Sequence, residues 1–392
     1  MTKLTSFLDF TKHTSLMGKQ YSKYLFFILF LALGLQTVSS QVKKNFEARY
    51  TADIRGDIPF IANNIVNRQT RATARWEWVF RNGSWRVEWV TRPATTPNDP
   101  YNATGPGTTS NDNFDMRYID VDDDPTTFSS SSATLTVPDI DCAIVRYAGL
   151  YWAAVYTDAD RSNIGNIKFK LPGGAYQDIT YDDELFDGYG DSDFGDYSPY
   201  AYYKDVTSMV SSLANPNGEY FVANMRVDNT NPVIGGISGG WKMVVVYENP
   251  NLPNDKFITT FDGYAGIKSE ESLDIPVSGF TTLPAPFPVY ANMGVAALEG
   301  DSAFGSPTGL SGDALQINAN GSFTTLSSDH NQPDNFFNSS ISQFENQFTD
   351  RNPNSINTLG WDVDLIEIPN GGTSNSVIPN GATSAILRAT SS

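Results

Sequence analysis

The stretch RWEWVFRNGSWRVEWV, residues 75–90, holds four of the seven tryptophans in the chain. Aromatic and aliphatic side chains alternate in it with arginine and glutamate, which is the period of a β-strand. Asn82-Gly83 at its centre is the strongest short signal for a β-hairpin, because both residues tolerate the positive φ of a type I′ turn. The predicted register sets three facing pairs on one side of the hairpin: Trp76 with Trp89, Trp78 with Val87, and Phe80 with Trp85.

This apolar face has two possible uses. Six large side chains would form one contiguous apolar patch, which soluble proteins seldom leave open, so we expect the face to pack against the rest of the chain. The alternative is an exposed platform on which sugar rings stack, with polar neighbours binding the hydroxyl groups. Its candidate ligand-binding residues are Trp76, Trp78, Trp85 and Trp89. The opposite side is expected to carry Arg75, Glu77, Arg81, Arg86 and Glu88.

The rest of the chain repeats the strand pattern. Short apolar or alternating runs recur between clusters of Gly, Pro, Asn, Asp and Ser, and helical periodicity is nearly absent. This pattern predicts an all-β fold, a large antiparallel β-sandwich of jelly-roll type. WKMVVVYE, residues 241–248, is apolar on both faces and is expected at the centre of a sheet. The other expected strands cover residues 46–52, 132–138, 143–156, 166–171, 219–227, 257–264, 291–298, 314–318, 361–368 and 384–390.

One short helix interrupts the expected strands. In KDVTSMVSSLANPNG, Asp205 is placed as the N-cap, and Met209 and Leu213 lie one helical turn apart. Asn215-Pro216 is expected to end this helix. The Pro-, Thr- and Asn-rich residues 91–113 read as a linker or long surface loop.

The first forty residues have the pattern of a signal peptide. Lys19 and Lys23 precede the apolar run LFFILFLALGL, and small residues lie at the expected cleavage positions. The alternative is an amino-terminal membrane anchor. We therefore expect export across the inner membrane to the cell surface or the extracellular space. The expected division is a signal peptide at 1–40, an amino-terminal strand, hairpin and linker at 41–113, and the sandwich domain at 114–392.

Charge and composition exclude several classes of function. The formal charge of the chain is −18, and removing residues 1–40 takes away four lysines and one aspartate, a net +3, which leaves −21. So acidic a surface argues against nucleic acid and anionic membranes as partners. Cys142 is the only cysteine, so no intrachain disulfide can form. His330 is the only histidine after residue 40, which excludes histidine-rich zinc sites and leaves one residue for any Ser-His-Asp triad.

Two acidic runs could hold an ion: YIDVDDDPTTF from residue 118 and DDELFDGYGDSDFGDYSPY from residue 182. Calcium takes six to eight oxygen ligands, which closely spaced aspartates and sharp glycine turns can supply. The candidate ligands are Asp120, Asp122, Asp124, Asp187, Asp191, Asp193 and Asp196. The alternative is a pair of solvated loops that keep an exported protein soluble. Two carboxylates across a cleft would also suffice for a secreted glycoside hydrolase.

Several longer runs resemble a known family. The runs are DMRYIDVDDDPTTFSSSSATLTVP, RYAGLYWAAVY, SGGWKMVVVYENP, ITTFDGYAGI, FPVYANMGVAALEGD and RNPNSINTLGWDVDLIEIPN. Together they resemble the amino-terminal region of very large surface proteins of gliding Bacteroidetes, a family that includes gliding-motility adhesins and is exported by the type IX secretion system. The resemblance covers most of residues 46–392. The tryptophan hairpin is not part of the family's usual pattern.

The resemblance implies a function and a set of partners. It implies a non-enzymatic adhesin module that contributes to surface attachment or gliding, since the family offers no catalytic motif to carry over. The implied partner of the full-length protein is the type IX secretion machinery. Surface polysaccharide and further copies of the chain are the other partners to consider. Family members continue beyond the equivalent of SAILRATSS with another strand and long repeats. We therefore expect an amino-terminal fragment of a longer protein, with an empty sheet position beside its last strand.

Overall fold

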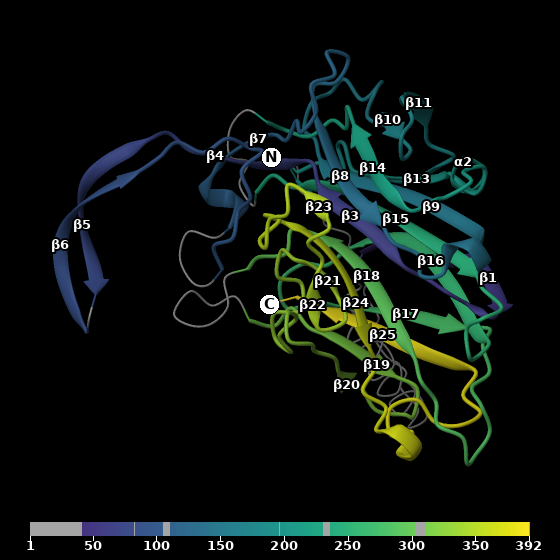
Figure 1. The fold of residues 1–392 in the computed structure, drawn as a ribbon. Helices are drawn as coiled ribbons and strands as arrows, with labels where there is room; N and C mark the ends of the chain where they lie inside the picture. Colours follow the sequence, from purple (N-terminus) through teal and green to yellow (C-terminus); the bar gives the residue numbers. More distant parts are fainter. Residues whose placement is uncertain are drawn as a thin grey trace, which may run out of the picture. The chain divides into compact units, whose positions relative to one another are not determined.

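The computed structural model describes residues 41–81, 83–104, 110–195, 197–229, 236–302 and 311–391 (Figure 1). The expected signal peptide, residues 1–40, lies outside them. Strands make up 48% of the described residues and helix 4%, far below the helix content of an average globular protein, so the all-β prediction is confirmed. Within the described residues, no helix has the length and apolarity needed to cross a membrane.

An antiparallel sheet of long and short strands lies at the centre of the fold. Its order is β12 (Asp183–Asp187), β13 (Pro199–Asp205), β9 (Ile144–Val155), β15 (Gly239–Glu248) and β2 (Gly56–Asp57), and β3 (Phe60–Asn64) also pairs with β15. β15 contains the run WKMVVVYE and has partners on both edges, as expected of a strand that is apolar on both faces.

A second sheet covers one face of the first. Its order is β11 (Tyr176–Thr180), β10 (Asn166–Lys170), β14 (Gly218–Ala223), β8 (Ser130–Leu135) and β23 (Arg351–Asn352). Alternate residues of β9 and β15, among them Trp152 and Trp241, pack against Phe169 and Tyr220 in one buried core. The Trp241 indole N–H crosses between the sheets and donates to Ser131 Oγ at 2.9 Å. These two sheets form the predicted sandwich.

The other face of the central sheet is covered by a two-stranded ribbon. β1 (Gln41–Ile54) and β16 (Lys256–Gly266) pair antiparallel, and Ile258 packs with Tyr147, Tyr151 and Val246 of the central sheet. Arg49 of β1 binds Asp262 of β16 and Asp183 of β12. The ribbon is therefore held to the sheet by both an apolar contact and an ionic one.

A second core lies in the carboxyl-terminal part of the chain. One four-stranded sheet has the order β17 (Ser272–Ser278), β25 (Ser384–Thr390), β19 (Leu315–Asn318) and β20 (Thr324–Thr325). Another has the order β18 (Asn292–Leu298), β24 (Trp361–Glu367), β21 (Ile341–Gln343) and β22 (Asn346–Gln347), with β21 parallel to β24. Their buried side chains include Met293, Ile317 and Ile366. The single expected sandwich is thus accompanied by a second pair of sheets.

Two expectations are corrected by strand pairing. β25 has β17 on one edge and β19 on the other, so the expected empty position beside the last strand does not exist. The expected boundary at residue 113 does not coincide with a break in the sheets. β1 to β4 (Val66–Gln69) pair with β16, β15 and β7 (Asp115–Tyr118), all of which follow that residue. Side-chain alternation cannot reveal which distant strands are neighbours.

A short helix is present where it was predicted, as α2 (Thr207–Ser211), but its N-cap is Val206 rather than Asp205, and it ends before Leu213 and Asn215-Pro216. Asp205 Oδ1 accepts the Thr207 N–H at 2.8 Å. In the described part of the chain this helix is accompanied by three 3₁₀ turns, η1 (Asn111–Asn113), η2 (Ile140–Cys142) and η3 (Gly372–Ser374). The remaining strands are β5 (Thr73–Arg81) and β6 (Ser84–Arg92), which form the tryptophan hairpin.

Candidate functional site

The tryptophan hairpin has the predicted register. Trp76 lies opposite Trp89, Trp78 opposite Val87, and Phe80 opposite Trp85. Gly83 has a φ of +76°, in the left-handed region that the Asn-Gly turn requires. Asn82 lies outside the described residues. Because directly paired residues share a face, all four tryptophans lie on the same side of the two-stranded ribbon.

The hairpin is anchored at its base. Thr70 and Thr95 exchange backbone hydrogen bonds, and their hydroxyl groups lie 2.8 Å apart. Arg68 donates to Thr95 Oγ1 at 2.6 Å and lies over the Tyr101 ring. Above this base, β5 and β6 pair only with each other in the described part of the chain. The fold therefore fixes where the ribbon begins and adds no third strand to it.

The aromatic face lies in solvent. The exposed fraction of the tryptophan side chains is 66% at position 76, 69% at 78, 65% at 85 and 56% at 89. The Trp76 and Trp89 rings meet edge to face with centroids 5.5 Å apart. The expectation that this face packs inward is wrong in this structure. Soluble proteins seldom expose large contiguous apolar patches, and the tryptophan face departs from that general tendency.

The other three tryptophans provide the contrast. Trp152, Trp241 and Trp361 are at most 3% exposed and belong to packed cores. The chain therefore separates its tryptophans into a buried set and an exposed set. The exposed set is confined to one face of one hairpin.

The hairpin differs in charge from the rest of the chain. Residues 71–92 contain five arginines and two glutamates, a net +3, in a protein whose overall charge is −18. Arg75 and Arg86 alternate with the tryptophans along the strands and so belong to the opposite side of the ribbon. The sequence shows the arginines and tryptophans of the hairpin, but whether they can contact a partner depends on the exposure of both faces of the ribbon. An exposed, cationic and aromatic ribbon suits an anionic partner.

The first acidic run forms a hydrogen-bonded loop. Asp120 accepts from Ser130, Asp122 accepts from Tyr176 and Thr127, and Asp124 accepts from Thr126. Although burial acts to raise it, these hydrogen bonds lower the pKa of Asp122 overall. Candidate oxygens of all three aspartates therefore accept hydrogen bonds from the loop itself and from β8 and β11.

The second acidic run is neutralised by basic side chains. Asp191 and Asp193 both bind Lys43, at 2.8 and 2.6 Å, and Arg161 binds both oxygens of Asp187. Asp196 lies outside the described residues. Across the described ranges, no group of three or more Asp, Glu, His or Cys side chains is placed to hold a metal ion. The sequence pattern could not foresee this, since Lys43 and Arg161 come from other segments.

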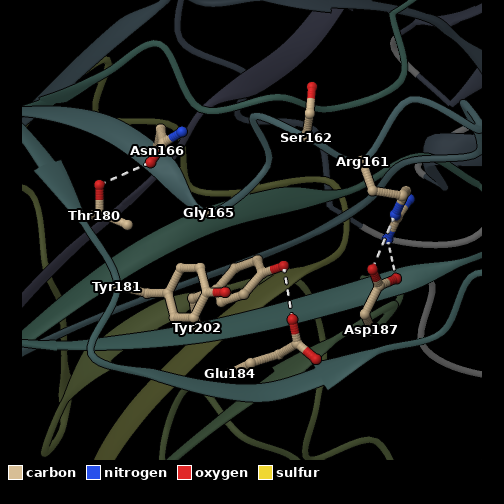
Figure 2. Close-up of a pocket in the computed structure, with 9 residues that line it drawn as sticks. All are labelled: Arg161, Ser162, Gly165, Asn166, Thr180, Tyr181, Glu184, Asp187 and Tyr202. Atoms are coloured by element: carbon tan, nitrogen blue, oxygen red, sulfur yellow. Dashed lines mark hydrogen bonds and ion pairs between the residues drawn. The ribbon is translucent and has the colours of Figure 1, made fainter.

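A shallow polar cavity of about 510 Å³ lies beside the second run (Figure 2). Its walls are formed by Arg161, Ser162, Gly165, Asn166, Thr180, Tyr181, Glu184, Asp187 and Tyr202. Figure 2 shows the Tyr202 hydroxyl pointing toward Glu184, at 3.3 Å, and Thr180 paired with Asn166. Burial, and then the charge of Glu184, raises the pKa of Tyr202.

This cavity lacks the two available carboxyl groups that glycoside hydrolysis needs. A glycoside hydrolase needs one carboxyl group as acid and another as base or nucleophile. Asp187 has both oxygens bound by Arg161, so only Glu184 remains available among the lining carboxylates. Tyr202 belongs to β13 (Pro199–Asp205), which was not among the strands expected from the sequence.

Comparison with known proteins adds no assignment: neither the family models nor the curated proteins compared with this chain gave a significant match.

Proposed function

We propose that this chain is a non-enzymatic attachment module of the cell surface that binds acidic polysaccharide through the aromatic face of the β5–β6 hairpin. One observation carries the proposal: Trp76, Trp78, Trp85 and Trp89 lie together on one face and are each more than half exposed. Exposing so much indole surface to water is unfavourable by roughly 25 cal/mol per Å². A binding partner that covers the face would recover that free energy.

Polysaccharide suits the geometry of the ribbon. Exposed indole rings along a strand pair can stack on the C–H faces of successive sugars, and such binding needs no deep cavity. The net positive charge of residues 71–92 favours carboxylated or sulfated sugars over neutral ones. The acidic remainder of the chain repels such polymers, which would confine binding to the hairpin.

The resemblance to gliding-motility adhesins supports the same proposal. An adhesin exported to the cell surface by the type IX secretion machinery would use a surface-binding element of this kind. The hairpin would then be a ligand-binding addition to the family's usual amino-terminal region. Association with other copies of the chain through the same face is the competing use, because the acidic body of a second copy is also anionic.

The decisive substitution is Trp78→Ala, at the middle of the exposed face. We expect its melting temperature to match that of the unaltered protein, since the Trp78 side chain is 69% exposed. We expect binding to an acidic polysaccharide such as alginate to weaken at least about tenfold, which corresponds to about 1.4 kcal/mol. Affinity electrophoresis in gels containing alginate measures the change, and gels containing neutral dextran test the charge preference.

Tyr290→Ala is the matched control, because Tyr290 is an exposed aromatic residue outside the hairpin. It should bind alginate as the unaltered protein does. Equal retardation of the Trp78→Ala variant and the unaltered protein would contradict the proposal. Loss of concentration-dependent self-association in the Trp78→Ala variant, with no polysaccharide binding by either protein, would favour the competing use.

A further inference from the structure

Two carboxylates are buried side by side in the second core. Asp362 and Asp364 lie on β24 and are both fully buried. Successive side chains of a strand alternate between its faces, so these two share a face with Ile366. On the other face, Trp361, Val363 and Leu365 pack with Phe60 and Ala62 of β3. The acidic pair is therefore enclosed in the molecule and is separate from both acidic surface runs.

Each carboxylate is satisfied at one oxygen only. Asp362 Oδ1 accepts the Ser340 N–H at 3.0 Å, and Asp364 Oδ1 accepts the Ser342 hydroxyl at 2.6 Å. Asp362 Oδ2 and Asp364 Oδ2 are buried without any hydrogen-bond partner. Neither residue forms an ion pair with a lysine, arginine or histidine in the described part of the chain. Two unpaired buried carboxylates would be very costly if both were charged.

Neutral oxygens surround the pair. Ser340 is 4% exposed, and its Oγ accepts no hydrogen bond; its hydroxyl lies close enough to Asp364 to lower the pKa of that carboxyl as a donor. A Cβ placed on Gly300 would lie 2.3 Å from Asp362 Oδ2 and 2.5 Å from the Phe337 carbonyl oxygen, so both oxygens face this glycine. Glycine at position 300 has no Cβ and so lets both oxygens approach the backbone closely.

Polar side chains on the same face of the sheet as Asp364 extend from β24 to β21 and β22. Ser342 lies opposite Asp364 in β24 and opposite Gln347 in β22, so the three side chains share a face. Gln347 Oε1 is also buried without a partner, and so is Asn338 Oδ1 of the loop that wraps Asp362. Most of the buried polar atoms without a hydrogen-bond partner around Asp362 and Asp364 are therefore oxygens. Their lone pairs could be used only by a proton or a cation.

We propose that Asp362 and Asp364, with Ser340 Oγ and neighbouring carbonyl oxygens, form a buried calcium site that joins β24 to the loop before β21. A divalent cation would neutralise both carboxylates and use the oxygens that the protein leaves unsatisfied. Hard oxygen ligands without nitrogen or sulfur select calcium or magnesium over transition metals. An enclosed site favours calcium, because magnesium keeps several of its waters when it binds.

The competing state is a pair of protonated acids. Burial raises the pKa of Asp362 and of Asp364, and the neighbouring charge raises that of Asp362 further. Protonated carboxyl groups could donate to nearby oxygens and need no ion. The two states respond oppositely to asparagine, which imitates a neutral acid but is a poorer calcium ligand. The effect of an Asp→Asn substitution therefore distinguishes a protonated pair from a calcium site.

The experiment uses protein that has been dialysed exhaustively against EDTA. Calcium chloride is titrated into it by calorimetry at pH 7.5, and melting temperatures are measured with calcium, with magnesium and with EDTA. We expect one calcium ion to bind per chain and the melting temperature to rise with calcium more than with equal magnesium. Asp364→Asn should abolish both effects. Ser340→Ala leaves both carboxylates in place and should weaken calcium binding about tenfold.

Asp122→Asn and Asp193→Asn are the matched controls on the surface runs, and both should keep the full calcium response. The proposal fails if the unaltered protein takes up no calcium and melts equally with EDTA while Asp364→Asn remains as stable, because the pair is then protonated. It also fails if either control abolishes binding while Ser340→Ala retains it in full. Should Asp364→Asn not fold, the Ser340→Ala affinity alone decides between these outcomes.

Discussion

At the residue scale, one amino acid serves two purposes in this protein. Tryptophan fills the core where strands from two sheets face each other, and it covers the outer face of the β5–β6 ribbon. Trp241 reaches Ser131 through its indole N–H and is completely buried, whereas Trp78 is mostly in water. The free energy that each side chain contributes to folding should therefore differ by several kcal/mol.

Trp241→Ala tests this contrast. We expect it to lower the free energy of unfolding by about 3–5 kcal/mol, because transfer energy is lost and a cavity remains between the sheets. Urea denaturation followed by circular dichroism measures the loss. Trp78→Ala should change the same quantity by less than about 0.5 kcal/mol. Similar losses in the two variants would show that the hairpin face is covered in solution.

At the element scale, the β1–β16 ribbon depends on charges that link it to the central sheet. Lys44 and Arg49 of β1 both bind Asp183 of β12, and Arg49 also binds Asp262 of β16. The Arg49 guanidinium lies 4.4 Å from the centre of the Tyr203 ring. Although burial acts to raise it, the hydrogen bonds from Lys44 and Arg49 lower the pKa of Asp183 overall.

Asp183→Asn should therefore destabilise the protein in a pH-dependent way. A lowered pKa contributes stability above the unfolded value of about 3.9, and that contribution disappears as the pH falls through the folded value. We expect Asp183→Asn to cost about 1–3 kcal/mol at pH 7, since two cationic donors lose a charged partner. The difference from the unaltered protein should shrink as the pH falls below about 3.9 and through the lowered pKa of folded Asp183, where this carboxyl itself becomes protonated.

Asp178→Asn is the control for this prediction, because Asp178 binds Lys168 but is 85% exposed. Its effect should stay below about 1 kcal/mol at either pH. Denaturation curves at pH 7 and pH 3 measure both variants. A cost for Asp183→Asn that is the same at both pH values would refute the ionic explanation.

At the scale of the whole molecule, the amino-terminal strand belongs to the fold and the forty residues before it have a different composition. β1 covers Gln41–Ile54 and runs beside β16. The run at residues 25–35 is apolar, whereas β1 mixes charged and apolar side chains. We propose a signal peptide followed directly by a structural strand as the reason for this difference in composition.

Amino-terminal sequencing of protein recovered from the cell surface or the medium tests the proposed export. We expect the first residue to lie at or near Gln41, because Val38 and Ser40 occupy the small-residue positions of the cleavage site. Recovery of surface protein that retains the run at residues 25–35 would instead favour a membrane anchor.

Much of the architecture was predictable from local pattern. Strands at 144–155, 239–248 and 361–367 follow from apolar periodicity, and the hairpin register follows from the Asn-Gly turn. The short strands β20 to β23 were not predictable, because they hold only two or three residues each. Their pairing depends on distant partners: β23, for example, joins the sheet only through β8. Local sequence carries no information on such a neighbour.

By itself the sequence determined the all-β class, the central position of the run at 241–248 and the shared face of the four hairpin tryptophans. Side-chain alternation and turn chemistry act over a few residues and are encoded locally. Only the tertiary structure decided which faces are covered. It exposes the tryptophan face, places Lys43 and Arg161 on the acidic run, and buries Asp362 and Asp364 without a basic partner. Burial and charge pairing depend on contacts between residues far apart in the chain, and these exist only once the sheets have packed.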